Sequence, residues 1–370
     1  MRTGIAELPL HPGRCPRWLF PRMVGLAEGI VDIIVFEYGA DELLRRLSDP
    51  FFFQSLGCAL AFDWHSSGLT TTVCGALKEA IDPEEHGLAV AGGKGRMSRK
   101  TPEEIKKISD ILSISSNSAK RLIYSSRLSA KVDNSCIQDG YNLYHHSFLF
   151  SENGDWCVIQ QGLNPENLYA RRYHWLSNSL ESFVEEPHSA ICSQKKEENV
   201  LDMTAKGSNE ARKMSVDLAK DNPKRLIRLC SIQKDLSSFI YPHKKELELH
   251  MHSDHRIFLS KQTFQSLQKA YEIQPQSYEE LVSIQGIGPA SIRALALVSE
   301  LIYGRPASWH DPSKFSFGHG GKDGIPFPVD RKTMDKSIEI LKAGIGEARV
   351  GQREKLHALR RLSSLMENSQ

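Results

Sequence analysis

The segment Leu281–Leu297 constrains the fold of this chain more than any other stretch. Two runs of apolar residues spaced three and four apart flank a short turn, and such spacing is typical of amphipathic helices. Gly286 and Gly288 bracket the turn, where glycine permits positive φ and a close approach of backbones. Pro289 suits the first turn of a helix, where its missing N–H has no partner to lose. We expect two helices joined by a tight turn over residues 278–303, with Ile287 filling the gap between them.

This pattern resembles the helix-hairpin-helix motif, with which many DNA-repair and recombination proteins hold a DNA backbone. The resemblance implies that Gly286, Ile287 and Gly288 bind nucleic acid, since amide N–H groups at a helix N-terminus suit a phosphate. The sequence departs from the motif at Ile292, where a small residue is usual. The alternative is a helical corner whose glycines only turn the chain.

Composition limits the class of protein only loosely. The 370 residues carry a net charge of +2, with 40% hydrophobic and 25% charged residues, so a polyanion binder must confine its basic surface to a patch. The seven cysteines are scattered and form no C-x-x-C pair, which favours reduced thiols in a cytoplasmic protein. No apolar run approaches 18 residues, and the first 20 residues do not read as a signal peptide, so we expect no membrane partner.

The chain divides into three parts by pattern. Residues 1–177 predict an α+β domain, with helices over 22–47 and 101–130, a buried apolar strand that ends near Phe62, and a β-hairpin that turns at Asn153-Gly154. Residues 178–212 are rich in polar side chains and predict a connector. Residues 213–370 predict an all-α domain that carries the helix-hairpin-helix at 278–303.

The strongest candidate site in the first part is Asp63-Trp-His65-Ser-Ser-Gly68. If this stretch is extended, Asp63 and His65 lie on one face and could act as a general acid–base pair or as ligands of a divalent metal. The sequence does not identify any other cofactor. The alternative is that both side chains only satisfy the backbone of a loop.

Basic and aromatic residues indicate further contacts with nucleic acid. Lys94 stands in a glycine-rich basic loop, Gly92–Gly95, which could approach a phosphate or simply be solvated. Arg171, Arg172 and His174 alternate with aromatic residues, a pattern that can stack bases and pair with phosphates. The alternative is an amphipathic element with its arginines in water. We expect the two arginines to bind nucleic acid and His174 to take part in catalysis.

After the hairpin, a Gly/Pro-rich loop leads to Val329-Asp330, an order that resembles the helix-hairpin-helix base-excision glycosylases. The resemblance implies that Asp330 assists loss of a damaged base. Pro289-Ala290 stands where members of that family with lyase activity have a lysine, which implies a water nucleophile and no Schiff base. The alternative is that Asp330 caps the following helix.

Over nearly its full length the chain resembles a conserved prokaryotic family classed as a domain of unknown function. The resemblance lies in Asp63–Gly68, Ala170–Trp175, the hairpin motif and Val329–Lys332. The functional hypothesis rests on the residues: a nucleic-acid-binding protein, most simply a DNA-processing or DNA-repair enzyme that hydrolyses phosphodiester or N-glycosidic bonds. The alternatives are a non-catalytic DNA-binding adaptor, an RNA-processing enzyme, and an enzyme acting on small phosphorylated molecules.

Overall fold

The computed structural model describes residues 15–62, 67–193, 196–225, 260–313 and 331–367. Helices come first along the chain: α1 (Phe20–Tyr38), α2 (Ala40–Ser48), α3 (Pro50–Ala59), α4 (Gly68–Ala80) and α5 (Pro83–His86). Next come β1 (Leu88–Lys94), the 3₁₀ helix η1 (Gly95–Lys100), α6 (Thr101–Ile111) and α7 (Ser116–Ser135).

The strands follow α7 in close succession. They are β2 (Ile137–Gln138), β3 (Asn142–Ser151), β4 (Trp156–Leu163), β5 (Ala170–Leu176), β6 (Ala190–Cys192) and β7 (Leu201–Asp202). The C-terminal helices are α8 (Asn209–Lys220), α10 (Lys261–Ile273), α11 (Tyr278–Ser283), α12 (Pro289–Tyr303), α13 (Arg331–Glu347) and α14 (Gln352–Glu367). The described chain is therefore a mixed α/β fold with helices in its C-terminal part.

Five strands form one antiparallel sheet in the order β1-β3-β4-β5-β6, and β2 pairs with β7 in a separate two-stranded ribbon. The predicted hairpin is confirmed as β3 and β4, in which Phe150 pairs with Trp156. The predicted basic loop is partly wrong, because Gly92 and Gly93 belong to β1. A Cβ on Gly92 would lie 2.2 Å from the carbonyl oxygen of His146, so the close pairing of β1 with β3 needs glycine there.

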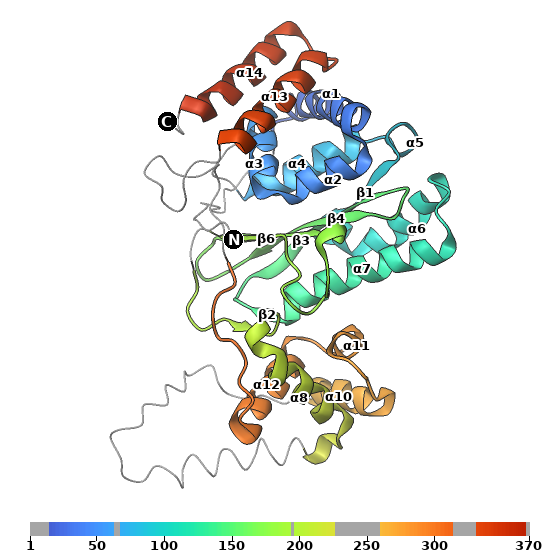
Figure 1. Ribbon diagram of the computed structural model, residues 1–370, viewed down its shortest axis with the longest axis vertical. Helices are drawn as coiled ribbons and strands as arrows, with labels where there is room; N and C mark the ends of the chain where they lie inside the picture. The colour runs from blue at the N-terminus through green and yellow to red at the C-terminus, as the bar shows by residue number, and fades with distance from the viewer. Residues whose placement is uncertain (1–14, 63–66, 194–195, 226–259, 314–330, 368–370) are drawn as a thin grey trace.

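Helices cover both faces of the sheet, which Figure 1 shows as layers from top to bottom. On one face, Val90, Leu149 and Ile159 pack with α1–α4, α13 and α14. On the other face, Phe148, Val158 and Trp175 pack with α6 and α7, and this core continues into α8 and α10–α12. Consecutive residues of a strand point to opposite faces, so each strand contributes to both cores.

The predicted apolar strand ending near Phe62 is wrong, because Pro50–Ala59 is helix α3. Asp49 caps this helix by accepting from the amide of Phe51, and Pro50 occupies its first turn. The helix is buried on all sides, so its sequence lacks the polar face that would have marked a helix. The predicted helices over 22–47 and 101–130 form as two pairs, α1 with α2 and α6 with α7.

The C-terminal helices lie on both sides of the sheet, whereas the sequence predicted one all-α domain for residues 213–370. Ile340, Leu341 and Ile345 of α13 pack into the core of α1–α4, whereas α8 and α10–α12 pack on the opposite side of the sheet. The predicted connector also belongs to the fold, since β6, β7 and the start of α8 lie within it and Cys192 and Leu201 are buried. In the described part of the chain, no helix combines the length and apolar character needed to span a bilayer.

The contact of α1 with α13 depends on two glycines. A Cβ on Gly344 would lie 2.6 Å from the Cα of Ile30, and one on Gly29 would lie 2.3 Å from the Cα of Ala348. We expect Gly344→Ala to lower the free energy of unfolding by about 1–3 kcal/mol, because the backbone of α1 must shift. Urea denaturation monitored by circular dichroism measures the change.

Gly346→Ala is the matched control in the same helix. A Cβ there meets no atom within 4 Å, so alanine should be neutral or stabilise by up to about 1 kcal/mol. Equal effects of the two substitutions would contradict the packing of α13 on α1.

Candidate functional site

The basic residues of β5 lie inside the molecule. Arg171, Arg172 and His174 have no exposed surface, so the prediction that they form a surface for nucleic acid is wrong in this structure. Because neighbours in a strand alternate, Arg171 faces the side of α7, and Arg172 and His174 face α3 and α4. The three side chains therefore do not form one site.

Arg172 joins the sheet to the N-terminal helices. Its guanidinium donates to Thr70 Oγ1 at 3.3 Å and to Gln54 Oε1 at 3.2 Å, and it lies over the ring of Phe53. Its Nε donates to His174 Nε2 at 2.9 Å. Burial and the neighbouring Arg172 hold the pKa of His174 well below its usual range, so this imidazole stays neutral and enclosed. The predicted catalytic role of His174 is therefore not supported by its position.

The row of polar residues on this face continues to the edge of the sheet. His145 and Gln161 pair across β3 and β4, and Gln161 donates to the carbonyl of Ser67 at 2.8 Å. Burial, then His146 and Lys94, lower the pKa of His145 to about 3. Lys94 is exposed, with its Nζ 5.8 Å from the ring centre of Tyr144. The predicted residues Asp63, His65 and Asp330 lie outside the described residues.

On the opposite face, Arg171 is held between two carboxylates. Its guanidinium donates to Asp139 Oδ2 at 2.9 Å and to Asp311 Oδ2 at 2.6 Å, and it stacks on Tyr141 at 4.5 Å. The two carboxylates raise the pKa of Arg171 against the effect of its burial, and Arg171 lowers the pKa of Asp311. This triad fixes residues 308–313, which follow α12, against the end of the sheet.

A second buried carboxylate, Asp133 of α7, holds a histidine. Asp133 accepts from Trp175 Nε1 at 3.0 Å, from Gln160 Nε2, and from His188 Nε2 at 2.5 Å. Behind it, Gln160 Oε1 contacts His146 Nδ1 at 2.8 Å. The carboxyl group is fully enclosed, and its two oxygens contact all three of these side chains. His188 therefore presents its Nδ1 away from Asp133.

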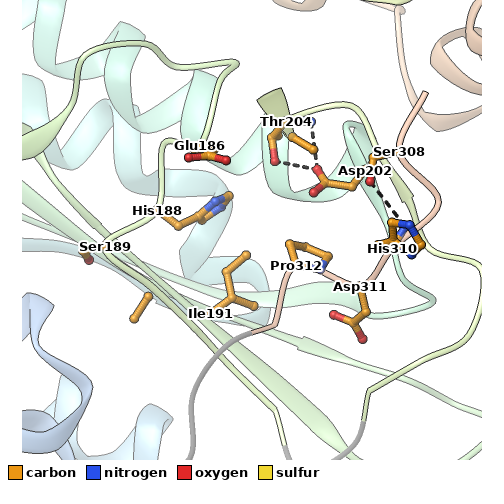
Figure 2. Close-up of a pocket in the computed structure, with 12 residues that line it drawn as sticks. Glu186, His188, Ser189, Ile191, Asp202, Thr204, Ser308, His310, Asp311 and Pro312 are labelled. Atoms are coloured by element: carbon orange, nitrogen blue, oxygen red, sulfur yellow. Dashed lines mark hydrogen bonds between the residues drawn. The ribbon is translucent and has the colours of Figure 1, made fainter. Parts of the chain in front are cut away.

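His188 lines a cavity of about 210 Å³ between the sheet edge and residues 308–312. Figure 2 shows His188, Asp202 and Pro312 around the same hollow. Asp202 accepts from the amide and the hydroxyl of Thr204, and burial raises the pKa of Asp202. The remaining lining residues are Glu186, Ser189, Ala190, Ile191, Thr204, Ala205, Ser308, His310 and Asp311. A buried carboxylate that orients an imidazole towards a cavity is an arrangement for general-base chemistry.

The glycine turn lies between α11 and α12. Gly286 has a φ of +100°, and a Cβ there would lie 2.8 Å from Ser266 Oγ. Ile287 is 1% exposed, as predicted, and Gly288 precedes the first residue of α12. Lys131 of α7 donates to the carbonyl of Ile284, and burial lowers the pKa of Lys131 to about 8. The turn itself is exposed at Gly286.

Two contacts join the turn to the wall of the cavity. Gln138 of β2 donates to the carbonyl of Pro289 at 2.8 Å, and β2 pairs with β7, which contains Asp202. Arg293 in α12 lies over the ring of Trp309 at 5.6 Å, and Trp309 stands between two lining residues of the cavity. The beginning of α12 and the cavity are thus parts of one packed region.

The sequence did not predict Asp133, His188, Asp202 or Asp311 as site residues. One signal was available for Asp133: Leu122, Ser126, Ser129 and Asp133 recur at helical spacing and are all buried, so the apolar stripe of α7 turns polar. His188 lies in the stretch predicted as a connector, where nothing marked it. The described residues contain no group of three or more His, Cys, Asp or Glu side chains placed to hold a metal ion.

A family model described as "Protein of unknown function (DUF763)" matches residues 4–329, and the chain belongs to this family. The matched residues include the sheet, the cavity and the turn, and they end before α13. The predicted resemblance to a domain-of-unknown-function family is confirmed. No curated protein and no solved structure matches the chain.

The Arg171 triad should dominate the stability of this region. We expect Arg171→Met to lower the free energy of unfolding by about 3–5 kcal/mol at pH 7, because Asp139 and Asp311 are left buried without their cation. Lone buried carboxylates have raised pKa values in the folded state, so their protonation favours folding. The loss should therefore shrink as the pH falls towards about 4. Chemical denaturation at both pH values measures this.

Arg45→Met is the control, because Arg45 pairs with Glu42 at the surface and its side chain is 53% exposed. Its loss should be about 0–1 kcal/mol. A loss at Arg171 no larger than that at Arg45 would contradict the role of the triad.

Proposed function

We propose that this member of the family binds nucleic acid through the turn between α11 and α12, and that it is a DNA-processing enzyme acting by hydrolysis. The observation that carries the proposal is the turn itself. Gly286 is exposed, Ile287 is buried between the helices, and Gly288 leads into a helix of 15 residues. We also propose that this pair of helices is a helix-hairpin-helix motif.

The turn offers amide groups to an anion. The first amide groups of an α-helix have no partner within the helix, and the helix dipole adds positive potential there. A Cβ on Gly288 would meet nothing closer than the carbonyl of Gly286 at 3.9 Å, so the approach to the start of α12 is open. A phosphodiester can therefore come close to the backbone at this point.

Cations lie on the α7 side of the turn. Lys131 contacts the turn directly through the carbonyl of Ile284. Arg127 is exposed and lies four residues earlier on α7, so both side chains occupy one face of that helix. Lys269 of α10 lies near enough to lower the pKa of Lys131. Lys131 thus places a cation against the turn in a protein of small net charge.

Gly288→Asp tests the proposal without disturbing the fold. Gly288 has a φ of −144°, which any residue adopts, and aspartate is a favourable residue before a helix. Its carboxylate would occupy the amide groups and repel a phosphate. We expect wild type to bind duplex DNA with an affinity that falls linearly with salt on logarithmic axes. We expect Gly288→Asp to bind at least about tenfold more weakly, a change of 1.4 kcal/mol.

Gly288→Ser is the matched control, since serine also caps the helix but carries no charge. It should bind within about threefold of wild type, well below a 1.4 kcal/mol change. Fluorescence anisotropy with duplex DNA and with RNA of the same sequence provides the measurement. Tighter binding of the RNA would redirect the proposal to RNA processing, and binding by Gly288→Asp equal to that of wild type would exclude the turn.

A further inference from the structure

We propose that the cavity beside His188 receives a single nucleobase turned out of the bound DNA, and that His188 activates water to hydrolyse its N-glycosidic bond. This inference rests on the proposed function, because the turn must first hold the strand. It narrows the reaction, for which the sequence left phosphodiester and N-glycosidic hydrolysis open.

The first support is the state of His188. Its Nε2 is engaged with Asp133, and among the described residues Nδ1 forms no hydrogen bond. A carboxylate that accepts from Nε2–H fixes the tautomer with a lone pair on Nδ1. The ring cannot turn over freely, because it packs edge-on against Trp175 at 4.7 Å. The Nδ1 of His188 is therefore positioned at the wall of the cavity to act as a general base.

The second support is the charge around the cavity. The carboxylates Glu186 and Asp311 line it, and Asp133 and Asp139 lie behind it, whereas burial raises the pKa of Asp202 and of Asp139. Among the residues that the structure describes, the Arg and Lys side chains paired with these carboxylates are Arg171, enclosed between Asp139 and Asp311, and Lys206, 3.6 Å from Glu186. The carboxylates Glu186 and Asp311 in its wall disfavour a phosphate inside the cavity. They favour a neutral base and the positive charge that develops on a sugar when its glycosidic bond breaks.

The third support is the size of the cavity and the chemistry of the residues that line it. Cavities that hold drug-sized ligands measure about 300–1,000 Å³, so 210 Å³ fits one small ring system. Ile191 and Pro312 offer apolar contact to a ring face, and Asp202 and Thr204 offer polar groups to a ring edge. Glu186 and His310 are exposed at the rim, which gives entry from solvent.

The fourth support is the position of the cavity beside the turn. Arg293 and Gln138 contact each other at 3.2 Å, and they join the beginning of α12 to Trp309 and to β7. A backbone held at Gly288 would therefore lie against the same packed region that forms the cavity wall. Enzymes that act on a base in duplex DNA turn the nucleotide out of the stack into such a pocket.

The step balances with water as the only co-reactant. His188 Nδ1 takes a proton from water, the oxygen bonds to C1′ of the sugar, and the bond from C1′ to the base nitrogen breaks. The electron pair of that bond leaves with the base, which takes up a proton. Burial raises the pKa of Asp202, so this carboxyl can carry that proton. The products are a free base and an abasic site.

Base extrusion is tested first, with a duplex that contains 2-aminopurine, whose fluorescence rises on unstacking. We expect wild type to raise the fluorescence. Ala205→Phe, which fills the cavity from its partly exposed rim, should bind the duplex normally and lose the rise. Gly207→Phe is the matched control, because a Cβ there meets nothing within 4 Å. It should keep both binding and the rise.

Hydrolysis is tested with end-labelled duplexes that carry each normal base, uracil or hypoxanthine at one position. Released base leaves an abasic site, which alkali cuts. We expect His188→Gln to bind and extrude normally but to release base at least about 100-fold more slowly. Imidazole should partly restore His188→Ala, which a merely structural role of His188 would not allow.

Each outcome decides between the two proposals. Failure of the wild-type protein to bind duplex DNA overturns the proposed function. Normal binding without a rise in 2-aminopurine fluorescence overturns only the cavity as a base site. Strand cleavage without alkali, or no base release from any of the duplexes, overturns N-glycosidic hydrolysis.

Discussion

The enclosed guanidinium of Arg171 needs two carboxylates that come from distant parts of the chain. Asp139 follows β2, whereas Asp311 lies more than 100 residues later, after α12. A buried cation without partners costs several kcal/mol, so the fold is stable only when both segments reach β5. This requirement brings residues 308–312 against the sheet edge, where they form one wall of the cavity. The ion triad therefore helps to hold one wall of the cavity in place.

The centre of the sheet is polar on both faces, and this distinguishes it from an ordinary apolar core. Arg172 and His174 face the N-terminal helices, and His146 and Gln160 face α7. Buried polar groups are costly unless they form hydrogen bonds, and here they bond to one another across strands and helices. Such a network specifies a single arrangement of the strands and aligns His188 through Asp133.

In the proposed function, the turn binds the DNA backbone and the cavity binds the base. Amide groups at the beginning of α12, with Lys131 against the turn, suit a phosphate, whereas the carboxylates around the cavity repel one. The two regions are joined by Gln138 and Arg293. A nucleic acid presents a charged backbone and neutral bases, and this pair of neighbouring sites matches both parts.

The sequence by itself determined the elements whose residues repeat with a clear period: the α11–α12 pair, the β3–β4 hairpin, and the burial of Ile287. It did not determine α3, because a helix that is buried on every side shows no clear hydrophobic period, and it placed Arg171 and Arg172 at a surface. Only the tertiary structure decided those positions, and only it joined Asp133 to His188, 55 residues apart, and Arg171 to Asp311, 140 residues apart. The physical reason is that hydrophobic periodicity is a local property, whereas the partner of a buried charge is chosen by the packing of the whole chain.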